Sequence, residues 1–246
     1  MRIVAIANQK GGTAKTTTAV NLAARLAMLG REVVLIDLDS QGSASACLGL
    51  VPSPGVHQWL IGGADFDAVT VEIRPHLRLL ASDASTAKAE LSLAGEDYRH
   101  EVLADRLAHV NGAEYIILDC APSRGLLHVA AHHAADLAII PVQVDHLAVV
   151  GCMQEMSAID AVRKRGHVIE VLAILPTFFE SVTLESTQNL AELRRLFGDL
   201  VADPIPRATK VREASAYGHT VFEHLATGHP VCVAYRKLGE RVLKNA

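Results

Sequence analysis

The sequence predicts an α/β protein with a doubly wound, mostly parallel sheet flanked by helices, and three observations support this. Short apolar runs, typical of strands buried on both faces, alternate with stretches of helical periodicity throughout the 246 residues. A glycine-rich loop joins the first such run to the first helical stretch. Half of the residues are hydrophobic but only 4% are aromatic, which favours helices on a sheet over a β-sandwich. We expect one domain spanning residues 1–246.

The sequence argues against a polycationic protein, a disulfide-linked protein and a membrane-spanning protein. The chain has 23 Lys and Arg against 27 Asp and Glu, a net charge of −4, so any nucleic-acid contact must come from a local basic patch. The four cysteines form no C-x-x-C pair and are expected to be free thiols in a reducing compartment. There is no signal-peptide pattern and no apolar run of the ~18 residues needed to span a membrane. We expect a cytoplasmic protein without membrane contact.

The first strand, loop and helix have the chemistry of a phosphate cradle. An apolar strand at 3–7 leads into the loop NQKGGTAKTTT at 8–18, and a helix is expected from about 15 to 29. The glycines allow backbone N–H groups to point at an anion, and the helix start adds unpaired N–H groups and the positive end of its dipole. Lys15 can then reach terminal phosphates, and the Thr16 hydroxyl can bind Mg²⁺.

Acidic residues end two further strands. The apolar run at 33–39 carries Asp37 and Asp39, which alternation places on one side, and the run at 115–119 ends in Asp119. Ligands bind at the carboxyl ends of parallel strands, so these carboxylates are expected beside the phosphate loop, where Asp119 can hold Mg²⁺. Residues 49–75 are expected to be loops with one short helix. Other strands are expected at 76–81, 137–143 and 170–175, and other helices at 84–110, 147–165, 184–197 and 233–243.

Five motifs then carry a resemblance to a known family. They are K-G-G-x-x-K-T-T, L-I-D-L-D-x-Q-G, I-I-L-D-x-x-P-S, P-V-Q and I-P-R-x-x-x-x-x-E-A, in that order. The loop departs from G-x-x-x-x-G-K-[ST] because Gln9 and Ala14 replace its glycines and Lys10 precedes them. It resembles the deviant Walker A loop of the ParA/MinD partitioning ATPases, in their short, Soj-like form.

The resemblance implies ATP or ADP and Mg²⁺ as ligands and gives roles to individual residues. Lys15 and the loop backbone would bind the β- and γ-phosphates, and Asp39 would position the attacking water. Lys10 would reach the phosphates of a partner in an ATP-dependent homodimer. The implied catalytic residues are Lys10, Lys15 and Asp39; the implied Mg²⁺ residues are Thr16, Asp37 and Asp119; and the implied nucleotide contacts are Lys10, Gly11, Gly12, Thr13, Ala14, Lys15, Thr16, Thr17, Pro206 and Ala208.

Two residues depart from the family pattern within this set. Ala14 stands where most relatives have glycine, and its methyl group either crowds the loop and slows hydrolysis or is accommodated at negative φ. Ala208 replaces an asparagine that commonly contacts adenine, which leaves the base selectivity open. Both effects stay unresolved by the sequence.

The resemblance implies slow, partner-stimulated ATP hydrolysis by a segregation ATPase. Its ATP dimer would bind nonspecific DNA at the nucleoid, and a ParB-like protein would stimulate hydrolysis. The alternatives are a positioning ATPase for a protein cargo, of the MinD or carboxysome-positioning type, and a metabolic P-loop ligase. The sequence identifies neither the cargo, the partner nor the replicon, chromosome or plasmid. Candidate DNA contacts are Arg194, Arg195, Arg207, Lys210 and Arg212.

Three histidines have helical spacing but no complete metal motif. His128 and His132 can share one face of a helix with His133 nearby, yet no glutamate completes H-E-x-x-H. We therefore expect surface or hydrogen-bonded histidines rather than a metal site.

Overall fold

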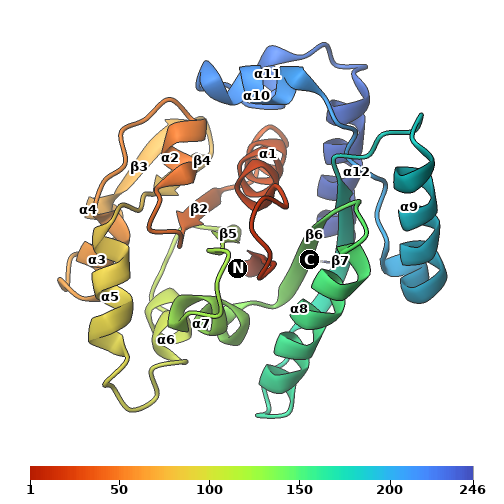
Figure 1. Cartoon of the computed structure of the whole chain (residues 1–246). Helices are drawn as coiled ribbons and strands as arrows, with labels where there is room; N and C mark the ends of the chain where they lie inside the picture. Colours follow the sequence, from red (N-terminus) through yellow and green to blue (C-terminus); the bar gives the residue numbers. More distant parts are fainter. Residues whose placement is uncertain (246) are drawn as a thin grey trace.

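A computed structural model describes residues 1–245 and shows one seven-stranded sheet with helices on both faces (Figure 1). The strand order is β3-β4-β2-β5-β1-β6-β7, and every neighbouring pair is parallel except β3 and β4. The predicted fold class is confirmed. The strands are β1 (Arg2–Ile6), β2 (Val33–Asp37), β3 (Thr70–Arg74), β4 (Leu77–Leu80), β5 (Tyr115–Asp119), β6 (Leu137–Gln143) and β7 (Glu170–Thr177).

The centre of the sheet is apolar on both faces, as its continuous hydrophobic runs require. Every residue of β2 and of β5 is buried, and β1 lies between β5 and β6. Alternate residues of these strands enter two separate hydrophobic cores, so Ile6 and Leu35 face one and Ala5 and Ile36 face the other. The sheet therefore carries a helix layer on each side.

Each helix layer can be assigned from the core to which its residues belong. The first layer contains α1 (Lys15–Ala27), α2 (Ser43–Cys47), α10 (Thr209–Ala216), α11 (Val221–His224) and α12 (Pro230–Lys244). The second contains α3 (Gly55–Leu60), α4 (Phe66–Val69), α5 (Ser85–Leu93), α6 (Val102–Leu107), α7 (Leu126–Ala134), α8 (Ala148–Arg163) and α9 (Leu184–Phe197), followed by the 3₁₀ turn η1 (Gly198–Leu200). No helix in residues 1–245 is both long and apolar enough to cross a membrane.

The expected elements differ from the observed ones at several places, and the short helices α2, α10 and α11 were not expected at all. The single helix expected at 84–110 is wrong, because a segment of turns that contains Gly95 and extends to Glu101 separates α5 from α6. The expectation of loops with one short helix at 49–75 missed the second short helix, α4, and the strand β3. This edge strand has exposed or half-buried residues and therefore lacks an apolar run.

Candidate nucleotide site

The phosphate loop lies between β1, the strand at the centre of the site, and the first turn of α1. Gly12 adopts a left-handed backbone, with φ of 74°, which costs glycine little. Within residues 1–245, no backbone N–H group of residues 11–14 donates to a protein acceptor. The Thr177 hydroxyl at the end of β7 donates to the Thr13 carbonyl at 3.1 Å and holds the loop from the other side. The loop therefore presents free donors at a helix start, as an anion site requires.

Ala14 is left-handed as well, with φ of 65°, and it immediately precedes α1. The expectation that its methyl group is accommodated at negative φ is therefore wrong. The left-handed region brings Cβ close to the following carbonyl, at a cost of roughly 1–2 kcal/mol for a residue other than glycine. The loop thus keeps the conformation that glycine would favour and bears backbone strain at this residue.

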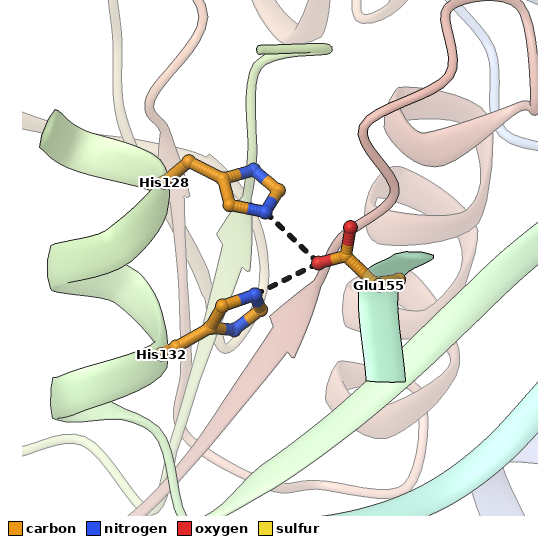
Figure 2. Close-up of side chains that lie close together, drawn as sticks. All are labelled: His128, His132 and Glu155. Atoms are coloured by element: carbon orange, nitrogen blue, oxygen red, sulfur yellow. Dashed lines mark hydrogen bonds and ion pairs between the residues drawn. The ribbon is translucent and has the colours of Figure 1, made fainter. Parts of the chain in front are cut away.

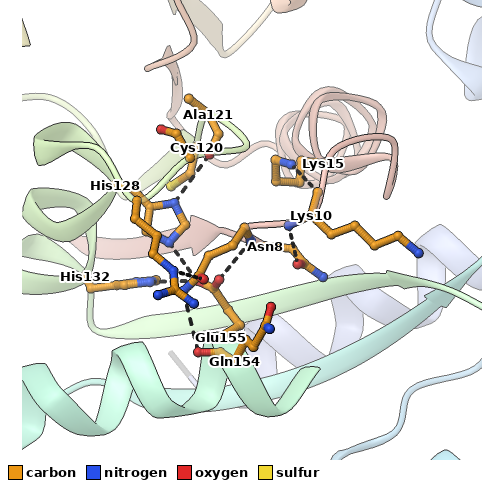
Figure 3. Close-up of polar contacts among 12 residues, drawn as sticks. Asn8, Lys10, Lys15, Cys120, Ala121, His128, His132, Gln154 and Glu155 are labelled. Carbon is orange, nitrogen blue, oxygen red and sulfur yellow. Dashed lines mark hydrogen bonds and ion pairs between the residues drawn. The ribbon is translucent and has the colours of Figure 1, made fainter. Parts of the chain in front are cut away.

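The two lysines of the loop differ in their surroundings (Figure 3). The Lys15 side chain folds back over the loop, with Nζ 3.1 Å from the Lys10 carbonyl oxygen. Burial lowers the pKa of Lys15, while Asp119, Cys120 and other acidic groups oppose this. Lys10 is partly exposed instead, and its Nζ forms an ion pair with Asp145 at 2.6 Å. Lys15 is therefore placed inside the cradle and Lys10 at its outer edge.

The three predicted carboxylates meet at the carboxyl ends of β2 and β5. Asp37 pairs in register with Asp119, and both are fully buried, whereas Asp39 is half-buried. Asp37 accepts backbone N–H groups of Asp39 and Ala44, each at 3.0 Å. Burial and the neighbouring Asp39 nevertheless raise the pKa of Asp37 to about 7.

Asp119 has the surroundings of a carboxylate that takes part in metal binding. Burial and the proximity of Asp37 raise its pKa well above the usual range, and the Thr16 hydroxyl and Lys15 oppose this. Neither oxygen of Asp119 has a partner in hydrogen-bonding geometry within residues 1–245. Buried, unpaired acceptors beside a threonine hydroxyl and a second carboxylate fit Mg²⁺, a cation that takes oxygen ligands and keeps several waters.

A cavity of about 450 Å³ adjoins the phosphate loop and is lined by the predicted base contacts. Its lining includes Ala14 and Thr17 at the start of α1, and Pro206 and Ala208 from the segment before α10. The segment around Pro206 is held by strand-like bonds to the extension of β7, including Arg207 N–H to the Phe179 carbonyl at 2.9 Å. An apolar cavity beside a phosphate cradle is suited to a nucleobase.

The candidate DNA contacts do not gather on one element. Arg194 and Arg195 lie in the last turn of α9, and Arg195 pairs with Glu192. Lys210 and Arg212 are exposed on α10, which lies apart from α9 in Figure 1. Arg207 is paired with Glu180 at 2.8 Å and lies over the Phe178 ring. The structure therefore leaves two small basic groups within one chain.

The histidines of α7 are hydrogen-bonded, as the sequence suggested, but they are buried rather than on the surface. Figure 2 shows His128 and His132 turned toward the same oxygen of Glu155, a residue that sequence reasoning missed. Glu155 lies on α8, 27 and 23 residues away from the two histidines. Nothing in the local pattern links them, because the contact depends on how α7 and α8 pack.

Comparison with known proteins agrees with this geometry. A family model described as an AAA domain matches residues 1–172. The chain is 37% identical to the chromosome-partitioning ATPase Soj of Thermus thermophilus, covering 99% of this chain and 96% of that protein. It is 35% identical to the chromosome partitioning protein ParA of Caulobacter vibrioides, covering 100% and 95%.

A solved structure is similar over the same length. Cobyrinic acid a,c-diamide synthase from Mycobacterium smegmatis, with bound ATP analog and magnesium, has a TM-score of 0.85 and 32% identity, covering 100% of this chain and 95% of that one. The matches to Soj and ParA extend over nearly the whole chain. This protein therefore belongs to the ParA/Soj family of partitioning ATPases, within the AAA-domain group.

Proposed function

We propose that the chain is an ATP-dependent partitioning ATPase that moves or positions chromosomal or plasmid DNA. The observation that carries the proposal is the meeting of Lys15, Asp37, Asp39 and Asp119 around one phosphate loop, with Lys10 at its outer edge. This arrangement can bind a nucleoside triphosphate and hydrolyse it. Relatives that are 35% and 37% identical over nearly the whole chain are chromosome-partitioning proteins.

Within one chain, each group has a separate task. The N–H groups of the loop and Lys15 bind the β- and γ-phosphates, and the cavity beside Pro206 receives the base. The Thr16 hydroxyl would hold Mg²⁺, with Asp37 and Asp119 supporting its shell, and the bound ion would supply positive charge against the charge that develops on the phosphates. Asp39 is the half-buried carboxylate, open enough to orient a water molecule toward the γ-phosphate.

Lys10 couples nucleotide to dimerisation in this proposal. Its ion pair with Asp145 is partly exposed, so exchanging it costs at most about 1 kcal/mol. A triphosphate on a facing chain offers Lys10 a stronger, less hydrated anionic partner. Two chains with ATP would then satisfy each other's lysines, whereas two chains with ADP would not.

The proposal also includes DNA binding by the dimer and stimulation of ATP hydrolysis by a partner protein. The basic groups on α9 and α10 are small in one chain, and dimerisation doubles them. Contacts of this kind bind phosphates without reading bases and weaken steeply with salt. A ParB-like protein would stimulate the slow hydrolysis and so end the DNA-bound state at the nucleoid.

A gel-shift experiment with nonspecific duplex DNA at low salt tests this function. We expect a shift with ATP and Mg²⁺ but none with ADP, and no shift with Lys15→Ala in either nucleotide. Lys88→Ala is a matched control, because Lys88 is exposed on α5, in the opposite helix layer from α1. Equal DNA affinity with and without ATP would contradict the proposal.

A second candidate is an ATP-dependent amide synthase, favoured by the likeness to cobyrinic acid a,c-diamide synthase. Such an enzyme activates a carboxylic acid, so its ATP turnover depends on a small-molecule acid and a nitrogen donor. Measuring ATPase activity with cobyrinic acid and glutamine, against activity with DNA and a ParB-like protein, separates the two functions.

A further inference from the structure

A buried group of three side chains lies outside the nucleotide site. Within residues 1–245, His128, His132 and Glu155 form the single group of three potential metal-binding side chains whose ligand atoms all lie within 4.8 Å of one another. Their side chains are at most 1% exposed. The proposed ATPase chemistry uses none of them.

The two ring nitrogens of His128 both face hydrogen-bond acceptors. Its Nε2 lies 2.9 Å from Glu155 Oε1, and its Nδ1 lies 3.3 Å from the Ala121 carbonyl oxygen (Figure 3). Both partners are acceptors, so a neutral ring with its proton on Nδ1 turns the lone pair of Nε2 toward the carboxylate. The other neutral tautomer donates from Nε2 to Glu155 but turns the lone pair of Nδ1 toward the Ala121 carbonyl. A metal ion on Nε2 lets the Nδ1 proton stay with Ala121 and so satisfies both sides of the ring.

His132 faces the same carboxylate oxygen. Its Nε2 lies 2.8 Å from Glu155 Oε1, and its buried Nδ1 has no hydrogen-bond partner within residues 1–245. Two imidazole nitrogens therefore converge on one carboxylate oxygen, and both groups are metal-ligand types.

We propose that His128, His132 and Glu155 bind a divalent transition metal of the Zn²⁺ class, separate from the Mg²⁺ of the phosphate loop. Two imidazole nitrogens and one carboxylate suit Zn²⁺ and its neighbours rather than Mg²⁺. Metal–ligand bonds of about 2.0–2.1 Å place tetrahedral ligand atoms about 3.3 Å apart, so Glu155 must withdraw by roughly half an ångström. The Nδ1 contact of His128 with the Ala121 carbonyl is the outer hydrogen bond that orients a metal-binding histidine.

The surroundings leave room for a fourth ligand. Both histidines border a groove of about 640 Å³ between α7 and α8, which also contains Gln154 and Arg124. Water in this groove can complete a tetrahedron, and the groove gives the ion a path of entry.

The group of His128, His132 and Glu155 also contacts the start of the phosphate loop. The second oxygen of Glu155, Oε2, accepts the backbone N–H of Gln9 at 3.0 Å, and Gln9 precedes Lys10. A metal on Oε1 fixes the carboxylate and so reduces the motion of the loop start. The inference concerns side chains of α7 and α8, and it stands whether or not the proposed DNA function does.

Metal titration of the full chain tests the inference. Chelator-treated protein is titrated with Zn²⁺ in excess Mg²⁺ against a chromogenic chelator, and then with Co²⁺, whose visible bands report four-coordinate geometry. We expect one equivalent of tightly bound Zn²⁺. His128→Gln and His132→Gln should each weaken binding by about a hundredfold or more, because losing even an outer-shell partner costs 10–100-fold.

His133→Gln is the matched control, since His133 lies on the same helix and is buried but bonds to the His100 carbonyl instead. It should bind Zn²⁺ as the wild type does. ATP-analogue binding shows that each variant is folded. Binding of less than one equivalent by the wild type, or equal loss in all three variants, would overturn the inference, as would Co²⁺ spectra without four-coordinate bands.

Discussion

At the scale of single residues, Ala14 shows how a loop tolerates a substitution without changing its path. Its φ of 65° strains an alanine, and the same φ is ordinary for glycine. Ala14→Gly should therefore leave the melting temperature unchanged or slightly higher, because relief of strain offsets the added freedom of the unfolded chain. Ala87→Gly, at an exposed position inside α5, should lower it by about 2–4 °C. Thermal melts check both variants, and an equal fall in the two would contradict the strain.

Asp37 gives a prediction about pH. Its pKa of about 7 in the folded protein exceeds the ordinary aspartate value of 3.8, so between those two pH values the folded state holds a proton that the unfolded chain has lost. Stability from this group is present below pH 4 and is lost as the pH rises toward 7. In EDTA, Asp37→Asn should therefore gain stability over the wild type by several degrees of melting temperature from pH 4.5 to 7.5.

The wild type and Asp37→Asn must be compared at each pH, because histidines titrate in the same range and change the stability in the opposite direction. His133, whose pKa burial lowers to about 4, adds stability as the pH rises. That contribution is common to both proteins and cancels in the difference. A difference that does not change with pH would show that Asp37 is ionised throughout.

At the scale of elements, the loop between β6 and α8 restrains Lys10 through Asp145. Asp145→Asn keeps an oxygen that can accept the Leu147 N–H but removes the charge. We expect ATP-dependent dimerisation to strengthen by a few-fold, in line with an exposed ion pair of up to about 1 kcal/mol. Sedimentation equilibrium measures this, with Asp160→Asn as the control because Asp160 pairs with Arg163 within α8. Weaker dimerisation in Asp145→Asn would count against the role of Lys10.

The elements also show what the sequence could predict. The buried strands β2 and β5 and the helix at 184–197 follow directly from apolar periodicity. The phosphate-loop residues were proposed from motif spacing, whereas Pro206 and Ala208 were proposed from the family resemblance. Strand β3 could not be found, because an exposed edge needs no apolar face. Glu155 could not be linked to α7, since that contact is set by helix packing.

At the scale of the whole molecule, the proposal predicts a change of mass with nucleotide. The chain has a mass of 26.3 kDa, and Asp39→Ala with ATP and Mg²⁺ should sediment at twice this value. Removing the group that orients water leaves ATP bound, so the dimer persists. Asp83→Ala, outside the cradle, should revert to monomer as ATP is consumed. A monomer of Asp39→Ala under saturating ATP would contradict the dimer.

The position of β1 in the sheet has a consequence for how the protein is made. This strand is synthesised before the other strands of the sheet, yet its neighbours are β5 and β6, which end at Asp119 and Gln143. At about 5–20 residues per second, roughly 113 residues of synthesis separate the two halves of the β1–β5 pair by about 6–23 s. During that interval the apolar strand and the loop after it have no sheet to join. The nucleotide loop is thus synthesised well before the two strands that flank β1, and an apolar strand left unpaired for that interval is prone to aggregate.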